Sequence, residues 1–228
     1  MDDLFADSPL QSQTLARADI LALADRPRTL ISCDLEEADL SQLDLTGWQF
    51  QQCYLRHADF SGARLEATQW QSCRGAFTRF IGSDLSDAQI SGCDFNNASF
   101  RGAVLQGAGL TGCKLTGADL SEVQVMDCEL AEVLLVAARL PGWSFRKAVL
   151  KRVDFSQADL RQCDFRDASL DNCSLRHARL DGARFDGADL RGADLGGVRL
   201  ANADAFRGAT ISRDQAGQLL RELGLVVR

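Results

Sequence analysis

The sequence predicts an all-β fold in which the chain winds as a continuous coil with four sides. From Leu30 to Leu200, 34 of the 35 residues at intervals of five are Leu, Phe, Ile, Val or Trp, and the exception is Gly75. Cysteine and phenylalanine also recur at intervals of twenty. A period of five matches neither an α-helix nor a plain strand. It fits a coil that turns a corner every five residues and closes after four corners.

The N-terminal segment, residues 1–27, is expected to cap the first coil. A stacked coil leaves strand edges at its ends, and these edges must be covered or paired. Residues Thr14 to Ala24 are compatible with a short helix that stops before Pro27. The first residues, Met-Asp-Asp-Leu-Phe, lack the basic and apolar regions of a secretory signal, and no apolar run has the length of a membrane span. We therefore expect a cytoplasmic protein without membrane contact.

Residues 28–204 form the predicted β-helix, and each five-residue unit places two side chains inside. Two residues before each large residue lies a smaller one, and 17 of these 35 positions are Ala and 8 are Cys. Cysteine packs as a small buried hydrophobe, so we interpret the cysteines as core filler in preference to disulfides or metal ligands. All eight occupy this small position: Cys33, Cys53, Cys73, Cys93, Cys113, Cys128, Cys163 and Cys173.

Three aromatic residues depart from the repeat. Trp48 and Trp143 occupy small positions, where an indole must either widen the coil or turn outward. Phe77 takes an outward position close to Gly75, the one central position without a large side chain. We favour a local bulge in which Phe77 swings inward to fill the gap, and the alternative is an exposed contact residue.

Other outward positions hold apolar and amide side chains. Exposed apolar clusters often mark interfaces, and Leu134 and Val136 join Phe77 as candidate apolar contacts. Stacked amides can bond along the axis of a coil as in cross-β ladders, so we predict a structural role for two glutamine columns. These columns are Gln49, Gln69 and Gln89, and Gln51 and Gln71.

Residues 205–228 leave the five-residue pattern and are expected to form a capping helix and a tail. Ser212 and Gln215 match a capping box, and Gly224 is a stop signal. The apolar surface of this segment exceeds what a cap requires, so a two-fold dimer contact is predicted. Its members are Leu219, Leu220, Leu223, Leu225 and Val226.

The five-residue unit resembles the pentapeptide-repeat family, in which a small residue is followed by Asp or Asn, Leu, any residue and Gly. Units such as Ala118 to Glu122 and Ala188 to Gly192 carry the resemblance, which extends over about residues 28–204. It implies a right-handed quadrilateral β-helix with four pentapeptides in each coil and with the large and small residues both facing inward.

No arrangement of residues predicts catalysis, a cofactor or a metal site. Gly107 to Gly112 matches a dinucleotide-binding glycine string, but its glycines fall at ordinary turn positions of the repeat. No Cys-x-x-Cys pair is available for zinc. His57 and His177 are six coils apart and cannot share a metal or a proton relay. The chain is therefore predicted to be a non-enzymatic binding protein without cofactors.

Charge is distributed unevenly along the sequence. The net charge of −7 argues against direct binding to nucleic acid or anionic membranes. Residues 1–138 hold 20 acidic and 9 basic side chains, whereas residues 139–228 hold 12 and 16. Solubility alone accounts for such charges, and the functional interpretation is a surface that steers a basic partner groove. The candidate residues are Asp34, Glu36, Glu37, Asp39 and Asp44, followed by Asp119, Glu122, Asp127, Glu129 and Glu132.

Within the family, the chain is most similar to the Qnr and MfpA group. The uninterrupted acidic coil, its length and the ending from Gln215 to Val227 carry this resemblance. It implies a cytoplasmic homodimer, joined through its C-terminal end, that acts as a DNA mimic. Such a protein binds DNA gyrase or topoisomerase IV and gives resistance to quinolones or related antibiotics. The alternative is an interaction scaffold or regulator with an unrelated protein partner.

Overall fold

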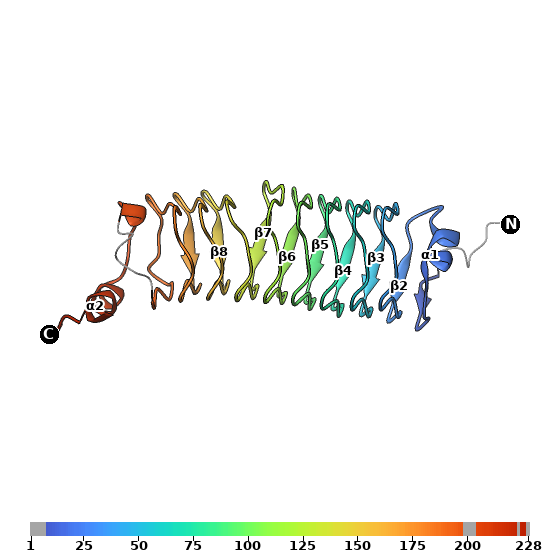
Figure 1. The fold of residues 1–228 in the computed structure, drawn as a ribbon, viewed down its shortest axis with the longest axis horizontal. Coiled ribbons are helices and arrows are strands. Elements are labelled where there is room, and N and C mark those ends of the chain that lie inside the picture. The colour runs from blue at the N-terminus through green and yellow to red at the C-terminus, as the bar shows by residue number, and fades with distance from the viewer. Residues whose placement is uncertain (1–7, 198–203, 223, 227–228) are drawn as a thin grey trace. The chain divides into compact units, whose positions relative to one another are not determined.

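The structure is a computed structural model that describes residues 8–197, 204–222 and 224–226. The chain forms two compact units, unit 1 at Met1–Glu129 and unit 2 at Leu130–Arg228. The fold is the expected right-handed quadrilateral β-helix, with parallel strands twenty residues apart and a helix near the C-terminus (Figure 1).

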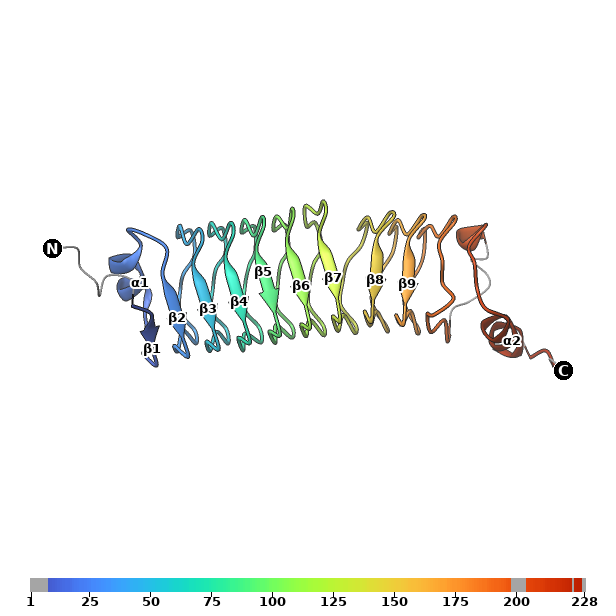
Figure 2. The ribbon, with the colours of Figure 1, turned by 180° about the vertical axis from the view of Figure 1, so that it is seen from behind.

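Unit 1 stacks its strands on one side of the coil (Figure 2). Neighbouring strands are parallel, and Leu30 pairs with Phe50, which pairs with Trp70. The other three sides contribute isolated parallel bridges with the same register, such as the bridge from Asp39 to Asp59. The strands are β1 (Leu10–Gln11), β2 (Thr29–Ile31), β3 (Gln49–Gln51), β4 (Gln69–Gln71), β5 (Gln89–Ser91) and β6 (Gly109–Thr111).

A short helix, α1 (Arg17–Leu23), forms inside the segment for which a helix was expected. The side chain of Ile20 is buried, and this burial anchors the helix against the rest of unit 1. The Arg17 guanidinium donates hydrogen bonds to the backbone carbonyls of Asp39 and Ser41 at 3.1 and 3.0 Å. These bonds tie the helix to the first complete coil.

The polar residues of the repeat build its corners. An aspartate before the central residue accepts a hydrogen bond from the backbone N–H two residues later, as Asp34 does from Glu36 at 3.0 Å and Asp39 from Ser41 at 3.0 Å. This is the side-chain turn that Asp favours. The last residue of a unit has a positive φ, which explains the frequent glycine there, although His57 adopts it as well with φ of 60°.

Stacked aromatic rings fill the interior of unit 1. Phe60, Phe80 and Phe100 form a column with ring centroids 5.3 and 4.8 Å apart. Trp48 lies inside the coil and is 1% exposed, so it does not turn outward. Its ring lies 6.2 Å from that of Phe50 and nearly parallel to it.

Phe95 fills the space beside Gly75, so the inward position expected for Phe77 is wrong. A Cβ atom added at Gly75 would lie 2.4 Å from Cε1 of Phe95. Phe77 is 45% exposed and has a φ of 63°. Its ring stacks on that of His57 with centroids 5.1 Å apart. The phenylalanine one coil later therefore occupies the gap, and Phe77 takes the alternative, exposed position.

The cysteines are free thiols in the small inward positions. Seven are buried and Cys128 is half-buried. Thiols donate hydrogen bonds to carbonyls of the preceding coil, as Cys73 does to Phe50 at 3.2 Å. Burial raises the pKa of Cys113 and of Cys163 to about 12. Unreactive core filler is the role that this environment supports.

Unit 2 continues the same construction. Strand β7 (Glu129–Ala131) includes the last residue of unit 1 and the first two of unit 2, and β8 (Val149–Lys151) pairs in parallel with β9 (Ser169–Asp171). Trp143 is buried in this unit, as Trp48 is in unit 1. Rings of Phe165, Phe185 and Phe206 stack at centroid distances of 4.7 Å. Phe185 and Phe206 are 21 residues apart, whereas the other stacked phenylalanines are 20 apart.

The helix α2 (Arg213–Glu222) closes unit 2 as expected. Ser212 and Gln215 form the capping box, with hydrogen bonds of 2.6 and 3.2 Å between the backbone N–H of each and the side chain of the other. The Gln215 amide also donates to the carbonyls of Leu190 and Ala193 at 2.6 and 2.7 Å. One side chain thus caps both the helix and the last coil.

Candidate protein-binding surfaces

The four sides of the coil can be named by the first central residue on each. The strand side carries Leu30, the second side Leu35, the third side Leu40 and the fourth side Leu45. In each five-residue unit three side chains face outward. These outward positions repeat at twenty-residue intervals, so a side can be examined coil by coil.

The ten predicted acidic residues do not share one side. In the first group, Asp34, Glu36 and Glu37 lie on the second side, Asp39 on the third and Asp44 on the fourth. The second group is spread over the third, fourth and strand sides. Eight of the ten are exposed, and Asp34 and Asp119 are half-buried. The structure therefore places carboxylates around the coil rather than in a single stripe.

Several of these carboxylates are neutralised by arginines of a neighbouring coil or of α1. Asp44 pairs with Arg64 at 3.0 Å, Glu122 with Arg101 at 2.8 Å, and Glu132 with Arg152. Asp39 is paired as well, with Arg17 at 3.2 Å. Asp119 also interacts with another residue. Among the described residues, the remaining five form no ion pair: Asp34, Glu36, Glu37, Asp127 and Glu129.

Hydrogen bonds at the corners also act on the paired aspartates. The Ser41 hydroxyl and backbone N–H lower the pKa of Asp39. Those of Thr46 lower the pKa of Asp44 in the same way. Part of the acidic sequence signal therefore comes from turn-forming residues of the repeat and not from a separate binding surface.

Unit 2 pairs many of its charges within single repeat units. Asp159 and Arg161 form a two-pronged pair with both bonds at 2.7 Å, and Asp189 and Arg191 form another. The Arg191 guanidinium lowers the pKa of Asp189 to about 2. These forks form because both side chains leave the same face of the short extended segment.

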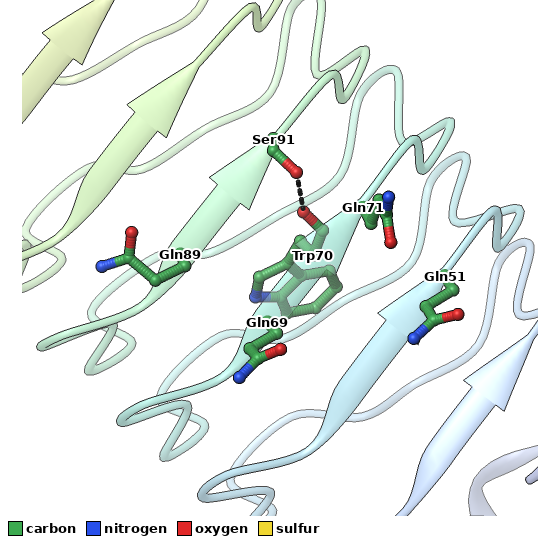
Figure 3. Close-up of a pocket in the computed structure, with 6 residues that line it drawn as sticks. All are labelled: Gln51, Gln69, Trp70, Gln71, Gln89 and Ser91. Atoms are coloured by element: carbon green, nitrogen blue, oxygen red, sulfur yellow. Dashed lines mark hydrogen bonds between the residues drawn. The ribbon is translucent and has the colours of Figure 1, made fainter.

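The strand side of unit 1 carries no charged side chain on its outward positions from Thr29 to Gly112. A shallow hollow of about 110 Å³ lies on this side (Figure 3). It is lined by Gln51, Gln69, Trp70, Gln71, Gln89 and Ser91. The glutamines stand in register, but within the described structure their amides form no hydrogen bonds with one another. The expected amide ladder is therefore wrong. Gln89, for example, leans over Gly109 of the next coil, where an added Cβ would lie 2.5 Å from its Oε1.

A larger hollow, called the Tyr54 hollow below, was missed by sequence reasoning. Its volume is about 580 Å³. It lies on the second side of unit 1, bordering the strand side, and it brings three basic side chains together in the acidic half of the sequence. Charge counts over long segments conceal them, whereas alignment of the coils at twenty residues would have shown them. The lining residues are Glu36, Tyr54, Arg56, Ser72, Cys73, Arg74, Ala76, Gly92, Asp94 and Lys114.

Exposed apolar side chains lie at several of the predicted positions. Phe77 is 45% and Leu134 40% exposed, whereas Val136 is only half-buried at the surface. In the C-terminal segment Leu225 and Val226 are 53% and 82% exposed. The remaining predicted dimer residues are Leu219, which is half-buried, Leu220, which is 38% exposed, and Leu223, which lies outside the described residues.

Two further observations concern other kinds of site. In the part of the chain that the structure describes, no three His, Cys, Asp or Glu side chains are arranged to hold a metal ion. Within the same ranges, neither helix has the length and apolar character needed to cross a bilayer.

Comparisons with known proteins agree with the geometry. Residues 29–100 and 103–185 match a family model described as a pentapeptide repeat region, and residues 83–121 and 168–204 match a model of pentapeptide repeats. Among curated proteins, none matches the sequence significantly.

Two solved structures of QnrB1 show the same coil. Full-length QnrB1, described as a plasmid-mediated fluoroquinolone resistance protein, is 21% identical, with a TM-score of 0.75 over 96% of this chain and 100% of that chain. A trypsin-treated QnrB1 variant is 20% identical, with a TM-score of 0.76 over 97% and 100%. HetL from the cyanobacterium Nostoc is 20% identical, with a TM-score of 0.37 over 82% and 86%. The likeness to QnrB1 establishes the fold. The family models match well over half of the residues of this chain, and the chain therefore belongs to the pentapeptide-repeat family.

Proposed function

We propose that this chain is a non-catalytic protein-binding β-helix whose partner is DNA gyrase or topoisomerase IV, and that it modulates the response of that enzyme to quinolones or related antibiotics. The observation that carries the proposal is a regular scaffold with an apolar interior and exposed carboxylates on unit 1. The choice of partner comes from the sequence resemblance to the Qnr and MfpA group, and the structural likeness to QnrB1, described as a fluoroquinolone resistance protein, supports the link to these antibiotics. The proposed location is the cytoplasm, where such a partner is found.

The proposed mechanism is mimicry of duplex DNA by carboxylates. A phosphate-binding protein surface attracts any suitably placed anions and releases counterions when they bind. Residues 1–129 hold 19 acidic and 9 basic side chains, which gives unit 1 a net charge of −10. The carboxylates Asp34, Glu36 and Glu37 are the strongest candidates, because none of them forms an ion pair with a described residue.

The test is a supercoiling assay with purified gyrase in which the protein is titrated with and without ciprofloxacin. We expect inhibition of supercoiling, protection from the drug, or both, and we expect the effect to weaken with added salt. Neither inhibition nor protection at a large molar excess would contradict the choice of partner. Circular dichroism of the same samples confirms that the protein is folded.

A second candidate function is an interaction scaffold or regulator with an unrelated protein partner. The uncharged strand side of unit 1 favours this function, because a surface of amides and hydroxyls without charge does not imitate the phosphates of DNA. Cross-linking in a cell extract distinguishes the two functions. Enrichment of a protein other than a topoisomerase, together with an inactive supercoiling assay, would favour this candidate.

We also propose that the protein is a homodimer joined through the C-terminal segment. Leu220, Leu225 and Val226 are exposed large apolar residues within one short stretch. Leu225 is held close to the helix because its backbone N–H bonds to the Leu220 carbonyl at 3.1 Å. Apolar residues gathered in this way stabilise a symmetric contact when two copies bury them together.

A further inference from the structure

The Tyr54 hollow brings together three basic side chains of unit 1 for which no ion pair is found among the described residues. Arg17, Arg28, Arg64, Arg79 and Arg101 each form an ion pair with a carboxylate. Arg26, in the N-terminal segment, also interacts with another residue. The three basic residues that remain are Arg56, Arg74 and Lys114, none of which forms an ion pair with a described residue, and all three line this one hollow.

The hollow combines these cations with an exposed aromatic ring. Tyr54 is 40% exposed, and the Arg74 guanidinium carbon lies 5.8 Å from the centre of its ring. This contact holds Arg74 over the ring but leaves its N–H donors available. Tyrosine and arginine are also the residue types that dominate binding energy at protein interfaces.

The order of charges on the second side indicates the shape of the ligand. Tyr54, Arg74, Asp94 and Lys114 follow one another in register, one coil apart. Coils lie about 4.8 Å apart, so Arg74 and Lys114 are separated by about 10 Å along the axis. A peptide in the extended polyproline II conformation rises about 3.1 Å per residue and completes a turn every three residues, so residues i and i+3 face the same way about 9 Å apart. Two carboxylates three residues apart would therefore meet the two cations.

We propose that the Tyr54 hollow binds an acidic, extended segment of a protein partner through Arg56, Arg74 and Lys114. A nucleic acid fits this surface poorly, because Glu36 and Asp94 lie among the cations and unit 1 as a whole is acidic. A peptide offers carboxylates at spaced positions and amide donors for Asp94 between them. Glu36, one of the carboxylates proposed to contact a topoisomerase, borders the hollow. The three cations that define the hollow take no part in that contact, so the proposal holds whether or not that enzyme is the partner.

The experiment uses the full chain and a fluorescein-labelled (Glu-Gly-Gly)4 peptide, with binding followed by fluorescence polarisation in 50 mM salt. The matched probe is (Gln-Gly-Gly)4 with the same label. We expect the acidic peptide to bind measurably and the glutamine peptide to bind at least about tenfold more weakly, since charge complementarity supplies the selectivity. A labelled single-stranded oligonucleotide of the same length is the third probe and is expected to bind more weakly than the acidic peptide.

Variants locate the binding on the protein. Arg74→Glu is expected to weaken binding of the acidic peptide by roughly tenfold or more. Arg64→Glu, which changes an exposed arginine outside the hollow, is the matched control and should change binding less than about twofold. Glu36→Gln removes a repelling charge and should tighten binding, in contrast to the loss that it would cause in a DNA mimic.

Three results would overturn the proposal. The first is equal binding of the acidic and glutamine peptides. The second is an equal loss of binding in Arg74→Glu and Arg64→Glu. The third is tighter binding of the oligonucleotide than of the acidic peptide. Thermal unfolding of each variant shows whether it folds, and the altered side chains are exposed, so little change is expected.

Discussion

Single residues in the core show how tightly one coil restricts the next. Gly75 has no side chain, and Phe95 leans into the space that a side chain would occupy. Thr78 is close as well, because its hydroxyl oxygen lies 2.7 Å from the position of an added Cβ. The glycine is thus required by packing and not by backbone conformation.

Replacement of Gly75 by alanine should therefore destabilise the protein. We expect Gly75→Ala to cost about 1–3 kcal/mol in the free energy of unfolding, since the new methyl group overlaps the Phe95 ring. The double variant Gly75→Ala with Phe95→Leu should lose less than the sum of the single changes, because leucine vacates part of the space. Chemical denaturation of the three variants measures this coupling. Strict additivity would show that the two residues do not compete for space.

Asp159 is the buried carboxylate whose charge contributes most clearly to stability. It is 8% exposed, and the fork from Arg161 lowers its pKa. A lowered pKa stabilises the folded state above the ordinary carboxyl pKa of about 3.9, and the stabilisation is lost as the pH falls through the lowered value.

We expect Asp159→Asn to lower the free energy of unfolding by about 1–2 kcal/mol at pH 7, since hydrogen bonds to charged groups are stronger than neutral ones. The difference from the unchanged protein should shrink as the pH falls from about 5 toward 2. Denaturant titrations across this range measure it. Asp87→Asn, at an exposed position that forms no ion pair with a described residue, is the control and should show little effect. A difference that persists unchanged at pH 2 would contradict the role of the charge.

At the scale of elements, the sequence predicts the features that recur in every coil. Prediction from the sequence is wrong where a side chain's position depends on its neighbour in the next coil. The five-residue period and the twenty-residue columns predict strands, register and aromatic stacks, because every coil meets the same geometry. The position of Phe77 could not be predicted, since it depends on how Phe95 packs one coil later. The ion pair of Asp44 with Arg64 is visible at a spacing of twenty, but only once the coil length is known. The amide columns were misjudged because register alone does not determine side-chain rotamers.

The C-terminal helix carries two separable predictions, one for capping and one for dimerisation. Gln215→Ala removes the side chain that caps both the helix and the carbonyls of Leu190 and Ala193. We expect a loss of about 1–2 kcal/mol, typical of a cap and its hydrogen bonds. Thermal unfolding measures the change, and Gln218→Ala on the exposed part of the helix is the control. Equal effects of the two changes would contradict the capping role.

The dimer contact is tested by Leu225→Ser with Val226→Ser. Both side chains are exposed in the single chain, so the folded unit should tolerate the change. We expect light scattering to give the mass of a dimer for the unchanged protein and of a monomer for the double variant. A monomer in both cases, or a dimer in both, would contradict the proposed contact.

At the scale of the whole molecule, the two units differ in charge. Unit 1 has a net charge of −10, while residues 130–228 hold 13 acidic and 16 basic side chains, a net of +3. Ion pairs remove part of the acidic signal of unit 1, so net charge overstates the anionic surface that a partner meets. The proposed DNA mimicry therefore depends on a few unpaired carboxylates and not on the whole acidic population.

This distinction can be tested with two matched triple variants. The first, Asp34→Asn with Glu36→Gln and Glu37→Gln, neutralises three unpaired carboxylates. The second, Asp39→Asn with Asp44→Asn and Glu66→Gln, neutralises three that pair with arginines. Both change the net charge equally. In the gyrase supercoiling assay, we expect the first to raise the half-effective concentration by roughly tenfold and the second by about twofold or less.

The physical reason is that a carboxylate already paired with arginine offers little attraction to a basic groove, and its removal also frees that arginine. The unpaired carboxylates lose their full interaction with the partner when neutralised. The difference between the two variants should narrow at high salt, because screening weakens exposed charges beyond about 8–10 Å. Equal potency of the two triple variants would show that only the net charge matters, and retention of full potency by the first would exclude Asp34, Glu36 and Glu37 from the contact.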